Sequence, residues 1–375
     1  MEANFKYLSV INYLKELINT GRLRENDKLP TEIELTQIFG VSRITVQKAF
    51  LELIREGIVY RNRGRGTFVS KVSSGGYTYK EKEKSGKLKF IGAVLPVDKG
   101  WGISYSVIQG IQEYAKKKDC YVTVHNSMQN PEEEEKIIRQ LVDNGACGII
   151  LMCVNMYSNL KLYRELLDKK FPLVFVDRCP KYLKVDFVGS DNYMGAYKLV
   201  NYLINLGHRK IALVANENET MTTVKERLNG YCDALIDNGI PICEKYMRIR
   251  DDNPDYDLKL IENFVEKLLG MEDPPTAIFA LNDFIAITCL NKIIKMGYSV
   301  PENVSVVGFD SIFKAEHMLV SLTTVEQPLQ EMGMMAGRLL FRRLRHSTNC
   351  FNQLYLPVNI VTGQSTDVCR MNLKK

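Results

Sequence analysis

The 375-residue sequence lacks the signals that would take a chain out of the cell or into a membrane. Its N-terminal residues have no charged start, apolar core and small-residue cleavage site, and no apolar run is long enough to span a bilayer. Apolar residues recur there at the spacing of an amphipathic helix instead: Tyr7, Leu8, Ile11, Leu14 and Ile18. We therefore expect a cytoplasmic protein, which argues against an exported transport receptor.

Side chains that build metal centres and disulfides are few and badly spaced. The nine cysteines are an odd number with no paired spacing, and Cys147 and Cys153 lie in apolar runs typical of buried strands. The four histidines are scattered, without an H-E-x-x-H pair. We expect reduced core thiols, no metal and no other cofactor.

Catalytic motifs are missing as well. The sequence has no G-x-S-x-G elbow and no phosphate-binding P-loop, and after the first predicted α/β strand it reads DKGWG rather than G-x-G-x-x-G. Asp283 and Asp310 could act as general bases, but they suit the role of hydroxyl acceptors better. A non-enzymatic function is predicted. The net charge of +6 is modest, so any basic surface should be local.

The segment 29–69 predicts a winged helix-turn-helix. Pro30 is expected to start a helix, Gly40 to end it, and Ser42 to cap a second helix that runs to Gly57. Apolar residues recur at helical spacing in both helices: Ile33, Leu35, Ile38 and Phe39 in the first, and Val46, Phe50, Leu53 and Ile54 in the second.

The polar face of the second helix carries the candidate base readers, because the start of this helix enters the major groove in helix-turn-helix proteins. These candidates are Arg43, Thr45, Gln47 and Lys48. Arg43 comes first, since its guanidinium can grasp guanine O6 and N7 together, worth about 1–3 kcal/mol of discrimination. The alternative interpretation is a solvated helix face.

The hairpin that follows favours the DNA interpretation. Strand-forming residues at 58–60 and 67–69 flank a glycine-arginine loop suited to the narrow minor groove or to phosphates. Its candidate contacts are Arg61, Arg63, Gly64 and Arg65. Through LPTEIEL, FGVSRITVQKAF, EG and GRGTFV, the segment closely resembles the GntR family of bacterial regulators. Family members often have a basic residue at the place of Ile33, so the resemblance does not extend to one phosphate contact here.

After this segment the composition changes twice, which predicts three parts: a DNA-binding domain at 1–71, a polar linker at 72–89 and an effector domain at 90–375. The last part alternates apolar strands with helices, the pattern of a doubly wound α/β fold, and its length favours two lobes with a cleft between them. Strands are predicted at 90–96, 121–125, 148–154, 173–177, 210–215, 277–281 and 304–309.

Polar residues follow several of these strands, at the sheet edge where ligands bind in parallel sheets. They include Asp98 and Trp101 in one loop, Asp177-Arg178 in another, then Asn282-Asp283 and Asp310-Ser311. Such side chains suit a polyhydroxylated ligand, because each hydroxyl both donates and accepts and an indole can cover a sugar face. Asp177 and Asn282 could equally cap the next helix.

The sequence from about 90 to 363 is similar to the effector domain of the LacI/GalR family, through FIGAVLP, FVDR, VGSDNYMGAYKLVNYLINLGHRKIALV, ERLNGY, FALNDFIAI, GYSVPENVSVVGFD and LTTVEQP. The resemblance implies ligand contacts at Arg227, Asn282, Asp310 and Gln327. Asp98, Trp101, Tyr105 and Arg178 are added from loop position alone.

A GntR-type head on a LacI-type sensor looks like the arabinose-repressor subgroup of regulators. This resemblance implies a homodimer on a palindromic operator and a repressor that a monosaccharide releases from DNA. Three alternatives stay open: a regulator that binds a sugar phosphate or a non-sugar ligand, a sugar-binding transport component, and an enzyme acting on a sugar.

Overall fold

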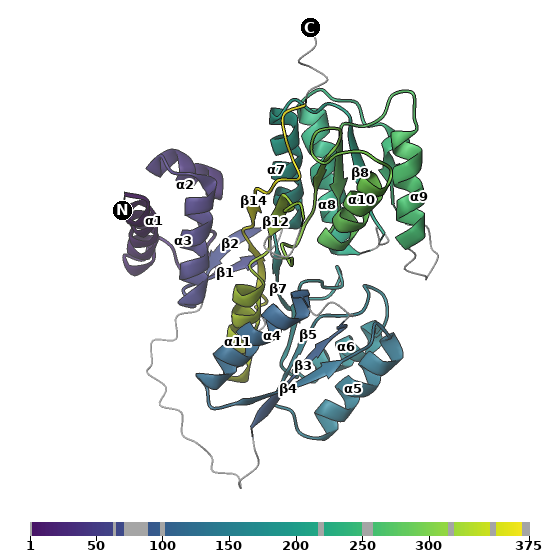
Figure 1. Cartoon of the computed structure of the whole chain (residues 1–375). Helices are drawn as coiled ribbons and strands as arrows, with labels where there is room; N and C mark the ends of the chain where they lie inside the picture. The colour runs from purple at the N-terminus through teal and green to yellow at the C-terminus, as the bar shows by residue number, and fades with distance from the viewer. Residues whose placement is uncertain are drawn as a thin grey trace.

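The chain folds into a small N-terminal helical unit and a larger α/β unit of two lobes (Figure 1). This computed structural model describes residues 2–62, 65–70, 89–97, 102–216, 221–249, 258–313, 319–345 and 350–369. Among these residues no helix is both long enough and apolar enough to cross a bilayer. Most of the predicted linker, 72–89, lies outside the described residues, and the three predicted domain boundaries stay predictions.

The N-terminal unit is the predicted winged helix-turn-helix. It contains α1 (Glu2–Asn19), α2 (Glu32–Phe39), α3 (Arg43–Arg55) and an antiparallel wing of β1 (Val59–Asn62) and β2 (Gly66–Val69). Gly40 turns the chain between α2 and α3 with φ 58°, a left-handed conformation that glycine adopts without strain. The core side chains of all three helices are fully or almost fully buried: Leu14, Leu35, Val46, Phe50, Leu53 and Ile54.

Helix α2 differs from the prediction in two respects. Thr31 is its N-cap, in a reciprocal capping box with Glu34, so Pro30 precedes the helix instead of starting it. Ile33 and Ile38 are 66% and 57% exposed, because this eight-residue helix packs through a narrower stripe centred on Leu35. Leu8 of the predicted first helix is likewise exposed.

The first lobe of the larger unit is a parallel sheet covered on both faces. Its strand order is β13-β7-β6-β5-β3-β4. These strands are β3 (Phe90–Leu95), β4 (Tyr121–Asn126), β5 (Ile149–Leu151), β6 (Leu173–Val176), β7 (Asp186–Ser190) and β13 (Gln353–Leu356). Helices α4 (Gly102–Lys116) and α11 (Leu329–Arg345) pack on one face, and α5 (Pro131–Asp143) and α6 (Leu160–Asp168) on the other.

The second lobe repeats this design with a parallel sheet ordered β11-β10-β8-β9. Its strands are β8 (Ile211–Val214), β9 (Met247–Arg248), β10 (Ala277–Ala280) and β11 (Ser305–Val307). Helices α7 (Asn192–Asn205) and α8 (Thr222–Asp237) cover one face, and α9 (Leu258–Leu269) and α10 (Asp283–Lys295) the other; a short 3₁₀ turn, η1 (Glu244–Tyr246), precedes β9. The doubly wound, two-lobed α/β fold is therefore as predicted.

The chain passes between the lobes three times: from β7 to α7, from β11 through β12 (Thr324–Glu326) to α11, and from β13 to β14 (Asn359–Val361). Strands β12 and β14 pair antiparallel beside α7. All seven predicted strands are present, but β5 is shorter than predicted, and Cys147 and Cys153 fall just outside it. All nine cysteines lie in the described residues, and no two of them are joined in a disulfide.

Candidate functional sites

The predicted base readers lie at the start of α3, where Ser42 sets their position. Ser42 is the N-cap and accepts a hydrogen bond from Thr45 N at 3.2 Å, which makes Arg43 the first residue of the helix. We call Arg43, Thr45, Gln47 and Lys48 the reading edge. Arg43 and Lys48 are exposed, and the other two are half-buried. Their contact with bases stays a prediction.

A buried carboxylate organises this edge. Glu32, which is 9% exposed, accepts from Arg43 Nε at 2.7 Å and from Gln47 Nε2 at 3.3 Å, and it also binds Arg61 of β1. Burial alone would raise the pKa of Glu32, but the charges of Arg61 and Arg43 outweigh it and hold the pKa below its ordinary value. The sequence interpretation missed Glu32, because only the fold brings Arg43 and Arg61 to it.

In the wing, Arg65 is exposed in the turn before Gly66, whose φ is 117°. Arg63 and Gly64, the other two predicted wing contacts, lie outside the described residues. The wing therefore presents at least one exposed basic side chain, and its contact with DNA stays a prediction.

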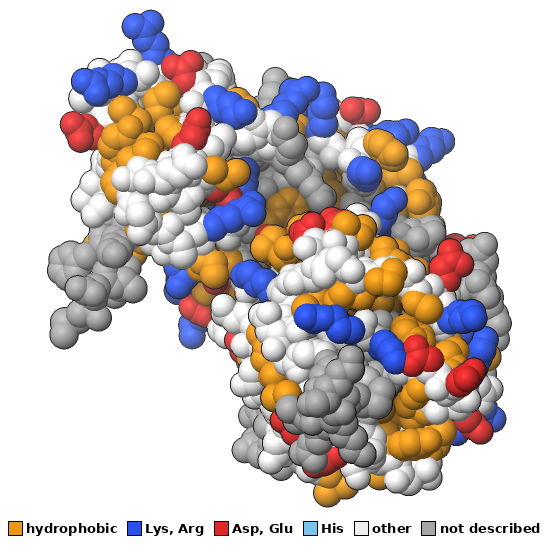
Figure 2. Space-filling view, turned by 90° about the horizontal axis from the view of Figure 1, so that it is seen from above, with side chains coloured by type: hydrophobic (Ala, Val, Ile, Leu, Met, Phe, Trp, Pro, Cys, Tyr) orange, Lys and Arg blue, Asp and Glu red, His pale blue; other side chains and the backbone are white. Residues whose placement is uncertain are grey.

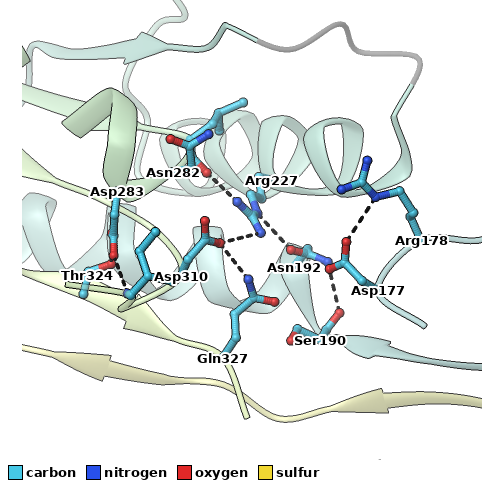
Figure 3. Close-up of polar contacts among 12 residues, drawn as sticks. Asp177, Arg178, Ser190, Asn192, Arg227, Asn282, Asp283, Asp310, Thr324 and Gln327 are labelled. Atoms are coloured by element: carbon cyan, nitrogen blue, oxygen red, sulfur yellow. Dashed lines mark hydrogen bonds and ion pairs between the residues drawn. The ribbon is translucent and has the colours of Figure 1, made fainter. Parts of the chain in front are cut away.

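In the larger unit, Arg227 of α8 is the centre of a buried polar cluster (Figure 3). Its Nε donates to Asn192 Oδ1 at 2.8 Å, its Nη2 lies 3.1 Å from Asp310 Oδ1, and it also donates to the carbonyl of Leu281. The guanidinium lies over the ring of Phe309, 3.7 Å from its centroid, a cation–π contact. These partners come from α7, from the end of β10 and from the end of β11.

Asp310 joins Arg227 to Gln327. Its Oδ1 accepts from Gln327 Nε2 at 2.6 Å, and its φ of 114° turns the chain sharply after β11. Asp310 and Gln327 are 4% and 5% exposed. Three of the four residues that the family resemblance implied, Arg227, Asp310 and Gln327, are thus brought into direct contact (Figure 3).

Three polar atoms at strand ends of the larger unit have unused hydrogen-bonding capacity. Gln327 Oε1, Ser190 Oγ and Asn216 Nδ2 are buried, and none of these atoms has a hydrogen-bond partner among the described residues. Buried polar atoms of this kind are normally satisfied, so they mark places where a polar partner completes the structure. They lie where β7, β8 and β12 end.

Asn282, the fourth implied contact, caps α10 by accepting from Ile285 N at 2.9 Å, as the helix-cap alternative predicted. The next residue, Asp283, accepts from Thr324 Oγ1 at 2.6 Å and from Ile312 N at 2.9 Å. Burial raises the pKa of Asp283 to about 6. Part of the polar sequence at this strand end therefore serves the fold.

The candidates chosen from loop position are more dispersed. Arg178 lies beside Asp177 at 3.2 Å, with its side chain 19% exposed, to one side of the Arg227 cluster (Figure 3). Tyr105 of α4 is 54% exposed and its hydroxyl accepts from Gln109 of the same helix. Asp98 and Trp101 lie outside the described residues.

The sequence interpretation missed Asn192, which accepts from Arg227, and Ser190, whose carbonyl accepts from Asn192 Nδ2. Asn192 and Ser190 belong to the VGSDNY motif, whose residue types alone do not indicate their partners. In the described parts of the chain, no three His, Cys, Asp or Glu side chains are grouped so as to hold a metal ion.

Family models match both units. Residues 6–69 match the bacterial regulatory proteins of the gntR family, and residues 200–366 match a periplasmic binding protein-like domain. An arabinose metabolism transcriptional repressor of Geobacillus stearothermophilus is 28% identical over 372 residues, which cover 97% of this chain and 98% of the relative. The HTH-type transcriptional repressor PurR of Vibrio atlanticus is 31% identical over 64% of this chain and 70% of its own length.

Among solved structures, a LacI family transcriptional regulator from Enterococcus faecium with bound ribose superposes with a TM-score of 0.63 and 26% identity. The superposition covers 75% of this chain and 99% of the Enterococcus faecium chain. The alignment of the first relative runs along both units, whereas the PurR and LacI-family alignments cover only about the length of the larger unit.

Proposed function

Because the chain belongs to the bacterial transcriptional regulators that join a GntR-type winged helix to a LacI-type effector domain, we propose that a monosaccharide bound between its lobes releases it from operator DNA. A pentose is the first candidate, since two relatives are named arabinose metabolism repressors and a similar LacI-family structure holds ribose.

The observation that carries this proposal is the cluster of Arg227, Asp310 and Gln327. A guanidinium, a carboxylate and an amide meet there, and buried Gln327 Oε1 has no partner among the described residues. Sugar hydroxyls donate and accept at once, so they suit such a mixed set. The ring of Phe309 packs against the Arg227 guanidinium and limits its movement.

We further propose that the protein acts in the cytoplasm as a homodimer on a palindromic operator, without enzymatic activity of its own. Two-fold symmetry in a protein dimer matches two-fold symmetry in DNA half-sites. The lobes would close on the sugar and change the separation of the two winged units, which requires that the open and closed states differ in affinity for the sugar.

A ligand screen tests the proposal. The full-length protein is titrated with pentoses, hexoses, deoxy sugars and their phosphates, and both Trp101 fluorescence and the melting temperature are recorded. One free sugar should give a saturable change in both signals and lower the affinity for an operator duplex selected from a random DNA pool by the protein itself. A response only to phosphorylated compounds would show that the effector is a sugar phosphate and not a free sugar. No response to any compound would reject a sugar effector.

The matched variants are Asp310→Asn, inside the cluster, and Asp237→Asn, at the end of α8 where Asp237 accepts from Tyr197. We expect the first to weaken the sugar response at least tenfold while it leaves operator binding intact, and the second to leave both unchanged. Equal losses in the two variants would count against the cluster as the sugar site.

A further inference from the structure

Two residues of the reading edge, Arg43 and Gln47, face the larger unit of their own chain. Arg43, Ile44 and Gln47 line a cavity of about 60 Å³ together with residues of α7 and of the segment between β13 and β14. The residues on the far side are Asp191, Met194, Lys198, Pro357 and Val358. Figure 1 shows the winged unit beside α7 and the β12–β14 pair, and in Figure 2 Lys and Arg side chains gather where the two units meet.

This contact is supported beyond the cavity itself. Strand β1 of the wing lies next to β13 of the first lobe. The buried apolar side chains of the winged unit also form one continuous cluster with those on the α4–α11 face of the first lobe. The winged unit is therefore seated on the larger unit by its strands as well as by α3.

The charges across the cavity are complementary. Asp191 caps α7 by accepting from Met194 N at 3.1 Å, and burial raises its pKa, while Arg43 and Lys198 favour its charged form. The hydrogen bond to Glu32 is the main reason that the pKa of Arg43 is raised, and Asp191 adds to that rise. Arg43 therefore interacts with two carboxylates, Glu32 of the winged unit and Asp191 of the larger unit.

The surface under the reading edge adjoins the Arg227 cluster. Asp191 is the neighbour of Asn192, whose Oδ1 accepts from Arg227 Nε. Val358 packs against Gly195 of α7, and so does Phe309, the residue below the Arg227 guanidinium. The first turn of α7 therefore lies beside both the cavity under Arg43 and the Arg227 cluster.

We propose that Asp191, Met194, Lys198, Pro357 and Val358 form a dock for the winged unit of the same chain, and that the dock competes with DNA for the reading edge. The dock holds Arg43, Ile44 and Gln47 when DNA is absent. A ligand that strengthens the hydrogen bond between Arg227 and Asn192 holds the first turn of α7 in place and so stabilises the docked state. This inference rests on the proposed DNA-binding role of the reading edge.

Cross-linking tests the docked state without any DNA or sugar. In a Cys350→Ser background, Ile44→Cys and Lys198→Cys are combined and treated with a short bismaleimide, and linked peptides are identified by mass spectrometry. The matched control is Lys48→Cys with Lys198→Cys, because Lys48 lies on the same helix but does not line the cavity. We expect at least fivefold more 44–198 product than 48–198 product, within one chain. Equal yields, or product only between two chains, would overturn docking within the chain.

DNA binding tests the competition. Met194→Lys places a cation opposite Arg43, and Asp191→Asn removes the attracting charge while it keeps an N-cap side chain. Only the undocked fraction of the wild type can bind DNA, so full undocking should raise the apparent affinity by the inverse of that fraction. We expect about three- to tenfold tighter binding of the selected duplex. Met128→Lys, the same substitution at a 69% exposed site in the first lobe, controls for the added charge.

The two readouts separate the possible failures. Specific 44–198 cross-linking with no gain of affinity in Met194→Lys over Met128→Lys would overturn the competition while it leaves the contact in place. A protein that selects no duplex from the random pool would instead contradict the proposed function, and the cross-linking result would still decide whether the dock exists.

Discussion

Two buried carboxylates in this chain bind the same kinds of partner, but their arginine partners differ in exposure to water. Glu32 binds Arg43, Arg61 and the amide of Gln47 at the reading edge, whereas Asp310 binds Arg227 and the amide of Gln327 between elements of the larger unit. The Arg43 side chain is 56% exposed, but that of Arg227 is only 8% exposed.

The difference shows what each cluster is built to do. An exposed guanidinium can exchange one carboxylate for a phosphate or a base edge at little energetic cost, because water screens both states. A buried guanidinium cannot leave its carboxylate without a large penalty, so it offers a fixed arrangement to a ligand. The reading edge is therefore exchangeable, and the Arg227 cluster is preorganised.

The largest expected effect comes from breaking the buried pair. Asp310→Ala leaves the Arg227 charge without its carboxylate and puts Ala at a φ of 114°, and we expect a loss of about 3–5 kcal/mol in the free energy of unfolding. Asp310→Asn keeps an acceptor and a residue that tolerates positive φ, so its loss should be clearly smaller. Chemical denaturation measures both, and equal losses would mean that the charge of Asp310 contributes little.

Asp283 sharpens the comparison, because its side chain accepts from a hydroxyl and a backbone N–H instead of a guanidinium. Its pKa is raised from 3.8 to about 6, so the folded state binds a proton more tightly than the unfolded state. The unfolding free energy should therefore fall as the pH rises from about 4 to about 6, by roughly 1–3 kcal/mol.

The measurement is the difference in stability between the wild type and Asp283→Asn across that pH range. The difference should shrink as the pH rises, because the variant has no proton to lose at this position. A difference that is constant with pH would contradict the raised pKa.

The sequence predicted most of the framework, since parallel strands covered on both faces appear as continuous apolar runs. It missed β7, which begins with the buried Asp186, an acid that is satisfied only in three dimensions by Arg342, Arg343 and Asn352 N. Strands β9, β12 and β14 are only two or three residues long and depend on tertiary pairing.

For the sites, the sequence indicated which residue types to expect but not which side chains contact one another. Arg227, Asp310 and Gln327 are 83 and 17 residues apart along the chain and meet only in the fold. Glu32 was missed because its role depends on α3 and β1 folding back over α2. The exposed Ile33 and Ile38 show the reverse error, in which helical spacing overstated the buried face.

On the exchangeable side, Arg43→Ala should reduce the preference for the selected duplex over a scrambled one by about 1–3 kcal/mol, a factor of roughly 5 to 150. Undocking would raise the affinity for both duplexes alike, so the ratio isolates base reading from the dock. The same preference is measured for Lys48→Ala, which removes another cation from the same helix. If Arg43→Ala weakens binding to both duplexes equally, Arg43 contacts phosphate rather than bases.

The smallest effect is expected for Glu32→Gln. Glu32 is buried, but the Arg43 and Arg61 side chains are 56% and 27% exposed and can be hydrated when the carboxylate is neutralised, so the unfolding free energy should fall by only about 1 kcal/mol or less. Removing the charge frees both arginines for phosphates, and binding to scrambled DNA should tighten a few fold, with the salt dependence steeper by about one phosphate contact. Glu25→Gln makes the same charge change at an exposed site of the winged unit, so it measures the general effect of charge. Only a gain beyond that of Glu25→Gln would show that Glu32 competes with DNA for these arginines, as an exchangeable cluster requires.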